Sequence, residues 1–266
     1  MITDPHAPAE INCDASKSVW RAMRLLDQLS CCDSPVGIRE LSRALGYPPT
    51  AIYRILSTME ISGFVRRAPD NPDKYVLGGK ILQLGARLLE KLEVRRVALP
   101  VMTEVRDRCN ETVDLFVADG AERLCVESVP SRQSVRWVAT IGTRMPIYAG
   151  AAGKVLLAYL PDRQLEGILS KGLQKITSTT ITDVDQLRDE LMAVRARGWA
   201  RSVGEYVAEN ACVAAPIRGG MPMAVQAAIS IAVPVTRFTP SLEKMLVDLI
   251  LEAADQISAM LGALSS

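Results

Sequence analysis

The sequence predicts an α+β protein, with a winged helix-turn-helix at the N-terminus, a connecting helix, and a larger C-terminal domain built on a β-sheet. Three observations predict this class. Two helical segments joined by a Gly-Tyr-Pro-Pro turn precede a basic hairpin within residues 36–77. A leucine-rich helical pattern begins at residue 79, and beyond residue 110 apolar residues recur with the period of strands. The length of 266 residues also suits about two domains.

The N-terminal segment is expected to contain a tail and a supporting helix. Residues 1–14 mix Pro, Asp and Asn, so we expect a flexible tail. A helix is predicted from Ser18 to Leu29, where it would support the helix-turn-helix. Its buried stripe is predicted to consist of Val19, Ala22, Met23, Leu26 and Leu29.

The helix-turn-helix is predicted next, with one helix up to Leu45 and a second from Pro49. Gly46 suits the left-handed residue that ends a helix, and proline suits the first turn of the next one. In the second helix the buried stripe is predicted to be Ile52, Ile55, Leu56 and Met59. The opposite face carries short or hydrogen-bonding groups that suit the major groove of DNA, namely Thr50, Ala51, Tyr53, Arg54 and Ser57.

A basic hairpin follows and is predicted to form the wing. Two short strands, Phe64–Arg67 and Lys74–Leu77, flank a polar turn at 70–73. Arg66 and Arg67 would lie beside the DNA backbone. Because the turn, the helix spacing and the basic wing agree with one another, DNA binding is the favoured interpretation. The alternative is a small helical subdomain whose hairpin binds a protein.

Composition limits the remaining classes of function. A net charge of +1 excludes a bulk polycation, so any contact with DNA must be a local patch, which a dimer would double. The six cysteines are scattered without a C-x-x-C pair, which favours a reduced, cytoplasmic protein without a zinc site. The N-terminus does not resemble a signal peptide, and no apolar run approaches the roughly 20 residues that span a membrane.

A helical segment is predicted to connect the two domains. From Gly79 to about Asn110 the apolar residues follow the helical period, with a break expected near Pro100. The part at 79–97 is expected to be a linker helix, apolar on one face and basic on the other. Because a lone helix with that much leucine needs a partner, the linker suggests dimerisation.

The C-terminal domain is predicted to alternate between strands and helices. Strands are predicted at 112–118, 123–129, 135–139, 212–217 and 224–233, and helices at 149–160, 161–170, 184–197 and 241–264. Asp183 and Gly198 are expected at the two ends of the third helix of this set. The helices are expected to cover one face of the sheet.

Catalytic chemistry is poorly represented in the chain. The one histidine, His6, lies in the expected tail, which argues against a Ser-His-Asp triad, a Cys-His pair and a His-rich metal site. Gly153 and Lys154 do not complete a phosphate-binding loop, because that pattern requires glycine where Tyr148 stands. We therefore expect no enzyme, no cofactor and no metal.

A candidate pocket lies between Gly142 and Lys154, where the chain passes from a strand through a loop into a helix. Small residues there would let a ligand approach backbone N–H groups, and the start of a helix favours an anion such as a carboxylate. The alternative is that glycine and alanine only permit close packing of the helix on the sheet. The sequence leaves both interpretations open.

Several motifs carry a family resemblance. In the first half they are Ser18-Val19-x-Arg21-Ala22, the stretch 41–64 and Tyr75-x-Leu77-Gly78. In the second half they are Gly142-x-Arg144-x-Pro146, Ala149-x-x-x-Gly153-Lys154, Ile181-Thr182-Asp183, Arg197-Gly198-Trp199, Cys212-Val213-Ala214-Ala215-Pro216 and Ser230. With these motifs the chain resembles the IclR family of bacterial transcription regulators from about Ser18 to Leu264. The resemblance implies a GAF-like effector-binding domain, a homodimer or dimer of dimers, and control of an operon by a small metabolite.

The resemblance also implies which residues bind double-stranded operator DNA. They are expected to be Arg39, Thr50, Ala51, Tyr53, Arg54, Arg66 and Arg67. Pro49 and Ala51 depart from the basic residue and the threonine that the family often has, so the operator sequence does not carry over. Arg39 stands where a serine or threonine cap is usual, a loss of about 1 kcal/mol unless its side chain meets a phosphate.

Effector-binding positions carry over in the same way. They are expected to be Met145, Gly150, Ala151, Ala152, Ser202, Glu205, Cys212, Ser230 and Ala232. Of the acidic residues that the family often has before the cysteine, this chain keeps Glu205, and Ala232 replaces a serine. Fewer hydrogen-bonding groups point to a less polar ligand than a very small hydroxy- or keto-acid.

The favoured interpretation is an IclR-type DNA-binding transcriptional regulator whose operator affinity depends on a small-molecule effector, an organic acid or an aromatic compound. The rival is a small-molecule sensor or enzyme-like domain whose winged helix docks to a protein. Domains are expected at 1–14 (tail), 15–78 (winged helix-turn-helix), 79–97 (linker helix) and 98–266 (effector-binding domain). The sequence does not decide between repression and activation.

Overall fold

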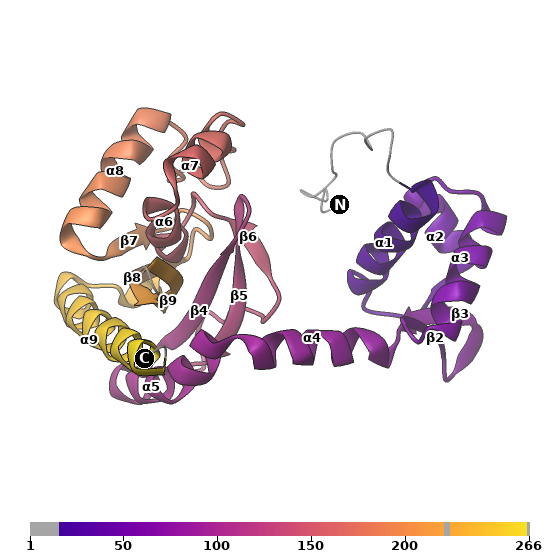
Figure 1. The fold of residues 1–266 in the computed structure, drawn as a ribbon, viewed down its shortest axis with the longest axis horizontal. Helices are drawn as coiled ribbons and strands as arrows, with labels where there is room; N and C mark the ends of the chain where they lie inside the picture. The colour runs from indigo at the N-terminus through magenta and orange to yellow at the C-terminus, as the bar shows by residue number, and fades with distance from the viewer. Residues whose placement is uncertain (1–15, 221–223, 265–266) are drawn as a thin grey trace. The chain divides into compact units, whose positions relative to one another are not determined.

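A computed structural model describes residues 16–220 and 224–264, so the expected tail at 1–14 lies outside the described residues. The chain divides into two compact units between Leu88 and Leu89. Figure 1 shows the helices and strands of each unit. None of the described helices is both long and apolar enough to cross a lipid bilayer.

The N-terminal unit is a winged helix-turn-helix, as predicted. Its elements are α1 (Lys17–Ser30), β1 (Val36–Gly37), α2 (Ile38–Leu45), α3 (Pro49–Ile61), β2 (Val65–Ala68) and β3 (Asn71–Leu77). The three strands form an antiparallel sheet in the order β1-β3-β2. The core of this unit includes Leu25, Leu41, Ile52, Leu56 and Tyr75, none of which is exposed to solvent.

Local sequence signals set the turn between α2 and α3. Gly46 has a φ of +70° and donates its N–H to Ser42 O at 2.9 Å, which confirms the predicted left-handed helix end. Proline occupies the first turn of α3, also as predicted. The assignment of Arg39 to a cap position is wrong, because the cap is Gly37, whose N–H donates to Glu40 Oε2 at 2.9 Å.

Two further local predictions for this unit are wrong. In α1, Leu25 is buried while Val19 and Met23 are exposed, because the helix is rotated so that a neighbouring apolar stripe faces the core. In the wing, the turn is at 69–70 and β3 already begins at Asn71, because Ala68 pairs with Asn71 and leaves a two-residue turn.

Two consecutive helices lead into the C-terminal unit. They are α4 (Gly79–Lys91) and α5 (Glu93–Cys109), and the break falls at Leu92, whose ψ of 91° is not helical. The predicted break near Pro100 is wrong. Pro100 lies on the exposed side of α5, where water can satisfy the carbonyl that loses its backbone partner.

The C-terminal unit contains a six-stranded antiparallel sheet in the order β6-β5-β4-β9-β8-β7. Its strands are β4 (Thr112–Asp119), β5 (Glu122–Val129), β6 (Arg144–Pro146), β7 (Ala200–Val203), β8 (Asn210–Gly219) and β9 (Ala224–Pro234). Its further helices are α6 (Ala151–Ala158), α7 (Asp162–Leu169), α8 (Val184–Arg197), the 3₁₀ turn η1 (Val235–Arg237) and α9 (Pro240–Leu264). These bounds confirm four of the five predicted strands and all four predicted helices.

Helices cover both faces of this sheet, so the prediction of one covered face is wrong (Figure 1). In β8, Val213 and Ala215 belong to the core that α5 and α9 complete, and Ala214 belongs to the core that α6 and α8 complete. The alternation of strand residues thus supplies two separate cores. The second core surrounds the candidate site described below.

The remaining differences concern short or irregular segments. No strand forms at 135–139, and the edge strands β6 and β7 were not predicted. The ends of α8 agree with the prediction, because Asp183 accepts the N–H of Gln186 at 2.8 Å and Gly198 has a φ of +81°.

Candidate functional site

The exposed face of α3 is the first candidate site. Ile52, Leu56 and Met59 bury the opposite face, as the helical period predicts. Thr50, Tyr53 and Arg54 are exposed, and Ala51 is half-buried, so these predicted DNA-binding side chains share the outward face. Within the described residues no hydrogen bond or ion pair uses the Arg54 guanidinium, which is therefore available to a partner outside the chain.

The three other predicted DNA-binding arginines differ in whether their side chains are exposed or held by contacts within the unit. Arg39 in α2 and Arg66 in β2 are exposed. Arg67 is held inside the unit: its Nε lies 3.2 Å from Glu60 Oε1, its Nη1 donates to Pro72 O at 2.6 Å, and its guanidinium lies 4.8 Å from the centre of the Tyr75 ring. These contacts make Arg67 a support of the wing rather than a free cation.

The second candidate site is a cavity between α6 and the sheet in the C-terminal unit. It is lined by Asp114, Phe116, Arg123, Trp137, Met145, Gly150, Ala151, Ala152, Ser202, Tyr206, Val207, Asn210, Cys212, Ser230 and Ala232. Strand register explains why distant residues meet there: Cys212 pairs with both Ser202 and Ala232. Asp114 of β4 pairs with Ser230 of β9, the strand that also carries Ala232.

Eight of the nine predicted effector-binding residues line this one cavity. The exception is Glu205, which lies beside it and binds Lys154 and the N–H of Gly150 instead. The lining residues that the sequence did not indicate are Asp114, Phe116, Arg123, Trp137, Tyr206, Val207 and Asn210. The expected preference for a less polar ligand therefore loses its basis, because the lining contains a buried guanidinium, a carboxyl and an amide in addition to the predicted groups.

Arg123 is the most unusual member of the lining because its charge is almost fully buried. Its side chain is 5% exposed, and burial lowers the pKa of the guanidinium. Its Nη1 donates to Pro146 O at 2.7 Å and to Ala149 O, its Nη2 lies 3.3 Å from Met145 Sδ, and its Nε has no hydrogen-bond partner in the described structure. The guanidinium also lies 5.4 Å from the ring centres of Phe116 and Tyr206.

Arg123 also explains two of the small residues around the start of α6. A Cβ on Gly150 would lie 3.1 Å from Arg123 Nη2. A Cβ on Gly153 would lie 2.2 Å from Ile147 O and 2.8 Å from Arg123 Nη1. Both glycines therefore make room for the protein's own guanidinium or backbone, whereas Ala151 and Ala152 face the cavity. The close-packing interpretation therefore holds for Gly150 and Gly153, whereas ligand binding at Ala151 and Ala152 stays a prediction.

Asp114 is the second buried ionisable group of the lining. It is 1% exposed, and burial raises the pKa of its carboxyl to about 7, against the lowering effect of hydrogen bonds from Ser128 and the Ala139 backbone and of the nearby Arg123 charge. The hydroxyl of Ser128 donates to Asp114 Oδ1 at 2.6 Å. Close to neutral pH this carboxyl is thus present in both forms.

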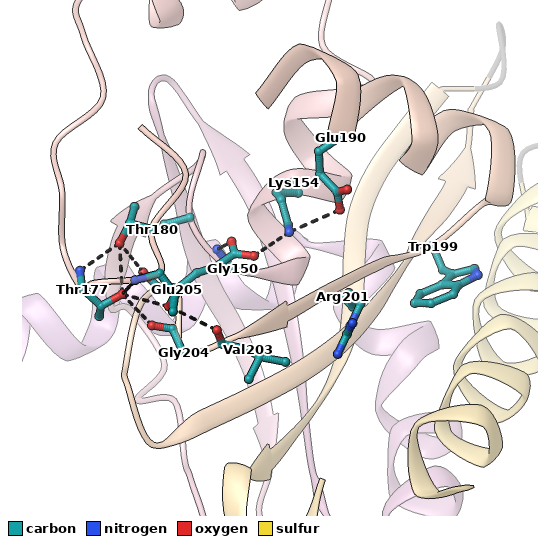
Figure 2. Close-up of polar contacts among 12 residues, drawn as sticks. Gly150, Lys154, Thr177, Thr180, Glu190, Trp199, Arg201, Val203, Gly204 and Glu205 are labelled. Atoms are coloured by element: carbon teal, nitrogen blue, oxygen red, sulfur yellow. Dashed lines mark hydrogen bonds and ion pairs between the residues drawn. The ribbon is translucent and has the colours of Figure 1, made fainter. Parts of the chain in front are cut away.

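A buried ion-pair network braces the wall of the cavity. Figure 2 shows the ammonium of Lys154 between the carboxylates of Glu190 and Glu205, at 3.3 and 2.6 Å. Glu205 Oε2 accepts the N–H of Gly150 at 3.0 Å, and Arg197 donates to Glu190 at 2.8 Å. The network joins α6, α8 and the loop after β7, and so fixes the start of α6 where it borders the cavity.

The loop after β7 is held by two threonines on the far side of Glu205. Thr180 donates to Glu205 O at 2.7 Å, and Thr177 donates to Gly204 O at 2.6 Å (Figure 2). The position of the Glu205 carboxylate is thus supported through its backbone as well as through Lys154.

Among the described residues no group of three or more His, Cys, Asp or Glu side chains is placed to hold a metal ion.

The cavity is small in this structure. Its free volume is about 30 Å³, enough for about one or two water molecules. A metabolite would therefore have to displace lining side chains. Trp137, Tyr206 and Val207 lie in lining segments that form neither helix nor strand.

Comparison with known proteins identifies two regions of the chain. Residues 18–69 match the model of the IclR helix-turn-helix domain. Residues 86–259 match the model of the C-terminal domain of bacterial transcriptional regulators of the IclR type. The first match lies within the N-terminal unit, and the second spans most of the C-terminal unit.

Individual relatives match this chain over more than nine tenths of its length. The HTH-type transcriptional regulator KipR of Bacillus subtilis (strain 168) is 35% identical over 248 residues, which cover 93% of this chain and 98% of KipR. The transcriptional repressor IclR of Escherichia coli (strain K12) is 27% identical over 253 residues, 93% of this chain and 91% of that protein. An IclR homologue of Microbacterium hydrocarbonoxydans, solved in complex with 4-hydroxybenzoate, is 28% identical with a TM-score of 0.80, covering 92% of this chain and 98% of that one.

Proposed function

Because this chain belongs to the IclR family of bacterial transcriptional regulators, whose members compared above are regulators rather than enzymes, we propose that it binds operator DNA through α3 and the wing and that a small molecule in the C-terminal cavity changes its affinity for that DNA. The proposed ligand is an organic acid or an aromatic compound. Ligand binding would alter how two DNA-binding units fit one operator.

The observation that carries the proposal is the outward face of α3. Thr50, Tyr53 and Arg54 supply a hydroxyl, a phenol and a guanidinium on one side of a helix whose other side is buried. Side chains of these kinds form hydrogen bonds to base edges and phosphates in the major groove. Arg66 on the wing adds a cation for the neighbouring backbone.

The C-terminal cavity supports the regulatory part of the proposal. It gathers eight of the nine residues that the family resemblance implied, and it contains aromatic, polar and charged side chains. A homologue with 4-hydroxybenzoate bound shows that at least one protein of this fold takes up an aromatic acid. We propose a ligand of the same general size.

A homodimer or a dimer of dimers is proposed as the working form. Leu82, Leu84 and Leu88 of α4 are 77%, 44% and 57% exposed, and the described helix buries none of its residues. A second copy would cover these leucines. It would also double the number of cations that a single operator neutralises.

Substitution of Arg54 tests the DNA-binding part directly. Arg54→Ala should weaken binding to a duplex selected in vitro by about 10- to 100-fold, because one guanidinium contact to a base or phosphate is lost. Fluorescence anisotropy with the full-length protein measures the change. Thermal stability should stay the same, because Arg54 has no partner within the described part of the chain.

Arg163→Ala is the matched control, because it removes an exposed arginine from α7 in the other unit and should leave the affinity unchanged. Wild-type binding should also fall steeply as salt is raised from 50 to 200 mM. Duplex binding that is absent, or that does not respond to salt, would favour the rival in which the winged helix docks to a protein.

A further inference from the structure

The cavity contains two buried polar atoms that nothing in the described structure satisfies. They are Arg123 Nε and Asn210 Oδ1, and the one other buried side-chain atom of this kind in residues 16–220 and 224–264 is the hydroxyl of Tyr75 in the N-terminal unit. Buried polar groups in folded proteins almost always have a hydrogen-bond partner. Two such atoms in one cavity leave one donor and one acceptor open to a bound molecule, either water or a ligand.

The Arg123 end of the cavity lacks an anion. The guanidinium donates to two backbone carbonyls and a thioether, and no described carboxylate lies within ion-pair distance of it. The N-terminus of α6 is directly beside it, because the missing Cβ of Gly150 leaves space that Arg123 Nη2 fills. A buried cation and the positive end of a helix both favour a negative charge at this end.

The carboxyl group of Asp114 does not fill this role at neutral pH. It faces Arg123 from the neighbouring strand without forming an ion pair with it, and burial, which raises its pKa to about 7, disfavours its negative charge. Glu205, the other acidic group near the start of α6, is 2.6 Å from Lys154 and is neutralised by that lysine. The positive charge of Arg123 is thus without a dedicated counterion.

The Asn210 end requires the opposite chemistry. Its Oδ1 is an acceptor without a donor, at the start of β8. The residues next to it in the lining, Tyr206 and Val207, belong to the loop before β8, and the cation of Arg123 lies over the Tyr206 ring. A ligand that reaches both ends would need an anionic group for Arg123 and a hydroxyl or amino hydrogen for Asn210.

We propose that Arg123 and Asn210 determine the specificity of the cavity for a small organic acid whose carboxylate binds Arg123 and whose second polar group donates a hydrogen bond to Asn210. Planar carbon between the two groups would lie against the rings of Phe116 and Tyr206. This inference rests on the proposed function, because it names the class of ligand for the same cavity. It adds the residues that select the ligand, and neither residue was indicated by the sequence.

The first test uses the wild-type full-length protein and matched pairs of compounds that differ in charge. Titration calorimetry and thermal shift would compare benzoate with benzamide, 4-hydroxybenzoate with 4-hydroxybenzamide, and pyruvate with pyruvamide. Every acid that binds should bind at least tenfold more tightly than its amide. 4-Hydroxybenzoate should also bind at least fivefold more tightly than 4-methoxybenzoate, which has the carboxylate but no donor.

Variants then assign the preference to the two residues. Arg123→Met should reduce the ratio between acid and amide to about one, and Arg123→Lys, which keeps the charge, should retain a preference for the acid. Asn210→Ala should remove the difference between the hydroxy and methoxy compounds and leave the preference for acids. Arg163→Met on the exposed face of α7 should change neither ratio. The wild-type comparison tests the inference even if Arg123→Met fails to fold, since Arg123 also supports two carbonyls.

The inference is overturned if any amide binds as tightly as its acid, or if no acid in the panel binds. It is also overturned if Arg123→Met folds and keeps the wild-type ratio. Its failure is distinguishable from failure of the proposed function. Acids that bind as expected but leave the affinity for duplex DNA unchanged contradict the regulatory function alone, whereas a neutral compound that changes the affinity for DNA from this cavity contradicts the Arg123 assignment alone.

Discussion

Replacing Lys154 with methionine should lower the free energy of unfolding of the C-terminal unit by about 3 to 5 kcal/mol. The ammonium is 2% exposed and lies 2.6 Å from Glu205 and 3.3 Å from Glu190. Methionine fills a similar volume but leaves the Glu205 carboxylate, itself 9% exposed, with the Gly150 N–H as its remaining partner. An uncompensated buried charge of this kind is far more costly than the loss of a surface ion pair.

Urea denaturation in a Trp20→Phe background would measure this effect, because Trp137 and Trp199 then report on the C-terminal unit. Arg188→Met, which breaks the exposed pair with Glu166, should change stability little. The double variant Lys154→Met/Glu205→Gln should recover much of the loss, because it removes both charges together. If Lys154→Met were as stable as wild type, the network would not brace the start of α6 as described.

Replacing Asp114 with asparagine should raise the stability of the same unit by on the order of 2 to 4 kcal/mol at pH 8. Burial raises the pKa of this carboxyl to about 7, above its ordinary value of 3.8. The folded state therefore holds a proton that the unfolded chain has released between about pH 4 and pH 7, and stability falls as pH rises through that window. Asparagine keeps an oxygen for the Ser128 hydroxyl and does not ionise.

Denaturation at pH 5, 6, 7 and 8 would give the free energy of unfolding as a function of pH for the wild type and for Asp114→Asn, and the two proteins should differ in the slope of that dependence. Wild-type stability should decline toward pH 8, and Asp114→Asn should decline less, so that the gap between the two proteins widens with pH. Asp185→Asn on the exposed start of α8 is the matched control and should follow the wild-type curve. Parallel curves for wild type and Asp114→Asn would mean that the carboxyl is ionised at no cost in the folded protein.

Segments with strong local signals could be predicted from the sequence. Gly46 and Pro49 define the turn before α3, and Asp183 and Gly198 define the ends of α8, because each of these residues acts through its own backbone conformation or its nearest neighbours. The outward face of α3 follows from the same kind of information, since the helical period separates its two sides.

Segments that depend on distant partners could not be predicted. Residues 135–139 alternate like a strand, yet they pair with no strand of the sheet, and Trp137 lines the cavity instead. Strands β6 and β7 consist of three and four residues and exist because β5 and β8 offer an edge to each. The start of α5 at Glu93 likewise reflects the packing of Val94 and Val97 on the sheet rather than a helix-breaking residue.

The residues that line the cavity also differ in whether the sequence could indicate them. Residues implied by family motifs gather there, whereas Arg123 and Asp114 could be found only through the sheet register. A weak signal existed: Arg123 stands two residues from Cys125, on the side of β5 that faces the second core, so a charge is expected to be buried there if the strand is placed correctly. Without the pairing of β4 and β5 this position could equally be exposed.

Ligand in the C-terminal cavity and DNA on α3 should influence each other's binding, which a reciprocal binding experiment would measure. The dissociation constant of the tightest acid in the panel would be measured for the free full-length protein and for the protein saturated with its selected duplex. The two constants should differ by at least fivefold, and the acid should shift the affinity for the duplex by the same factor. Equal constants for the acid, with both partners demonstrably bound, would show that the cavity does not regulate DNA binding.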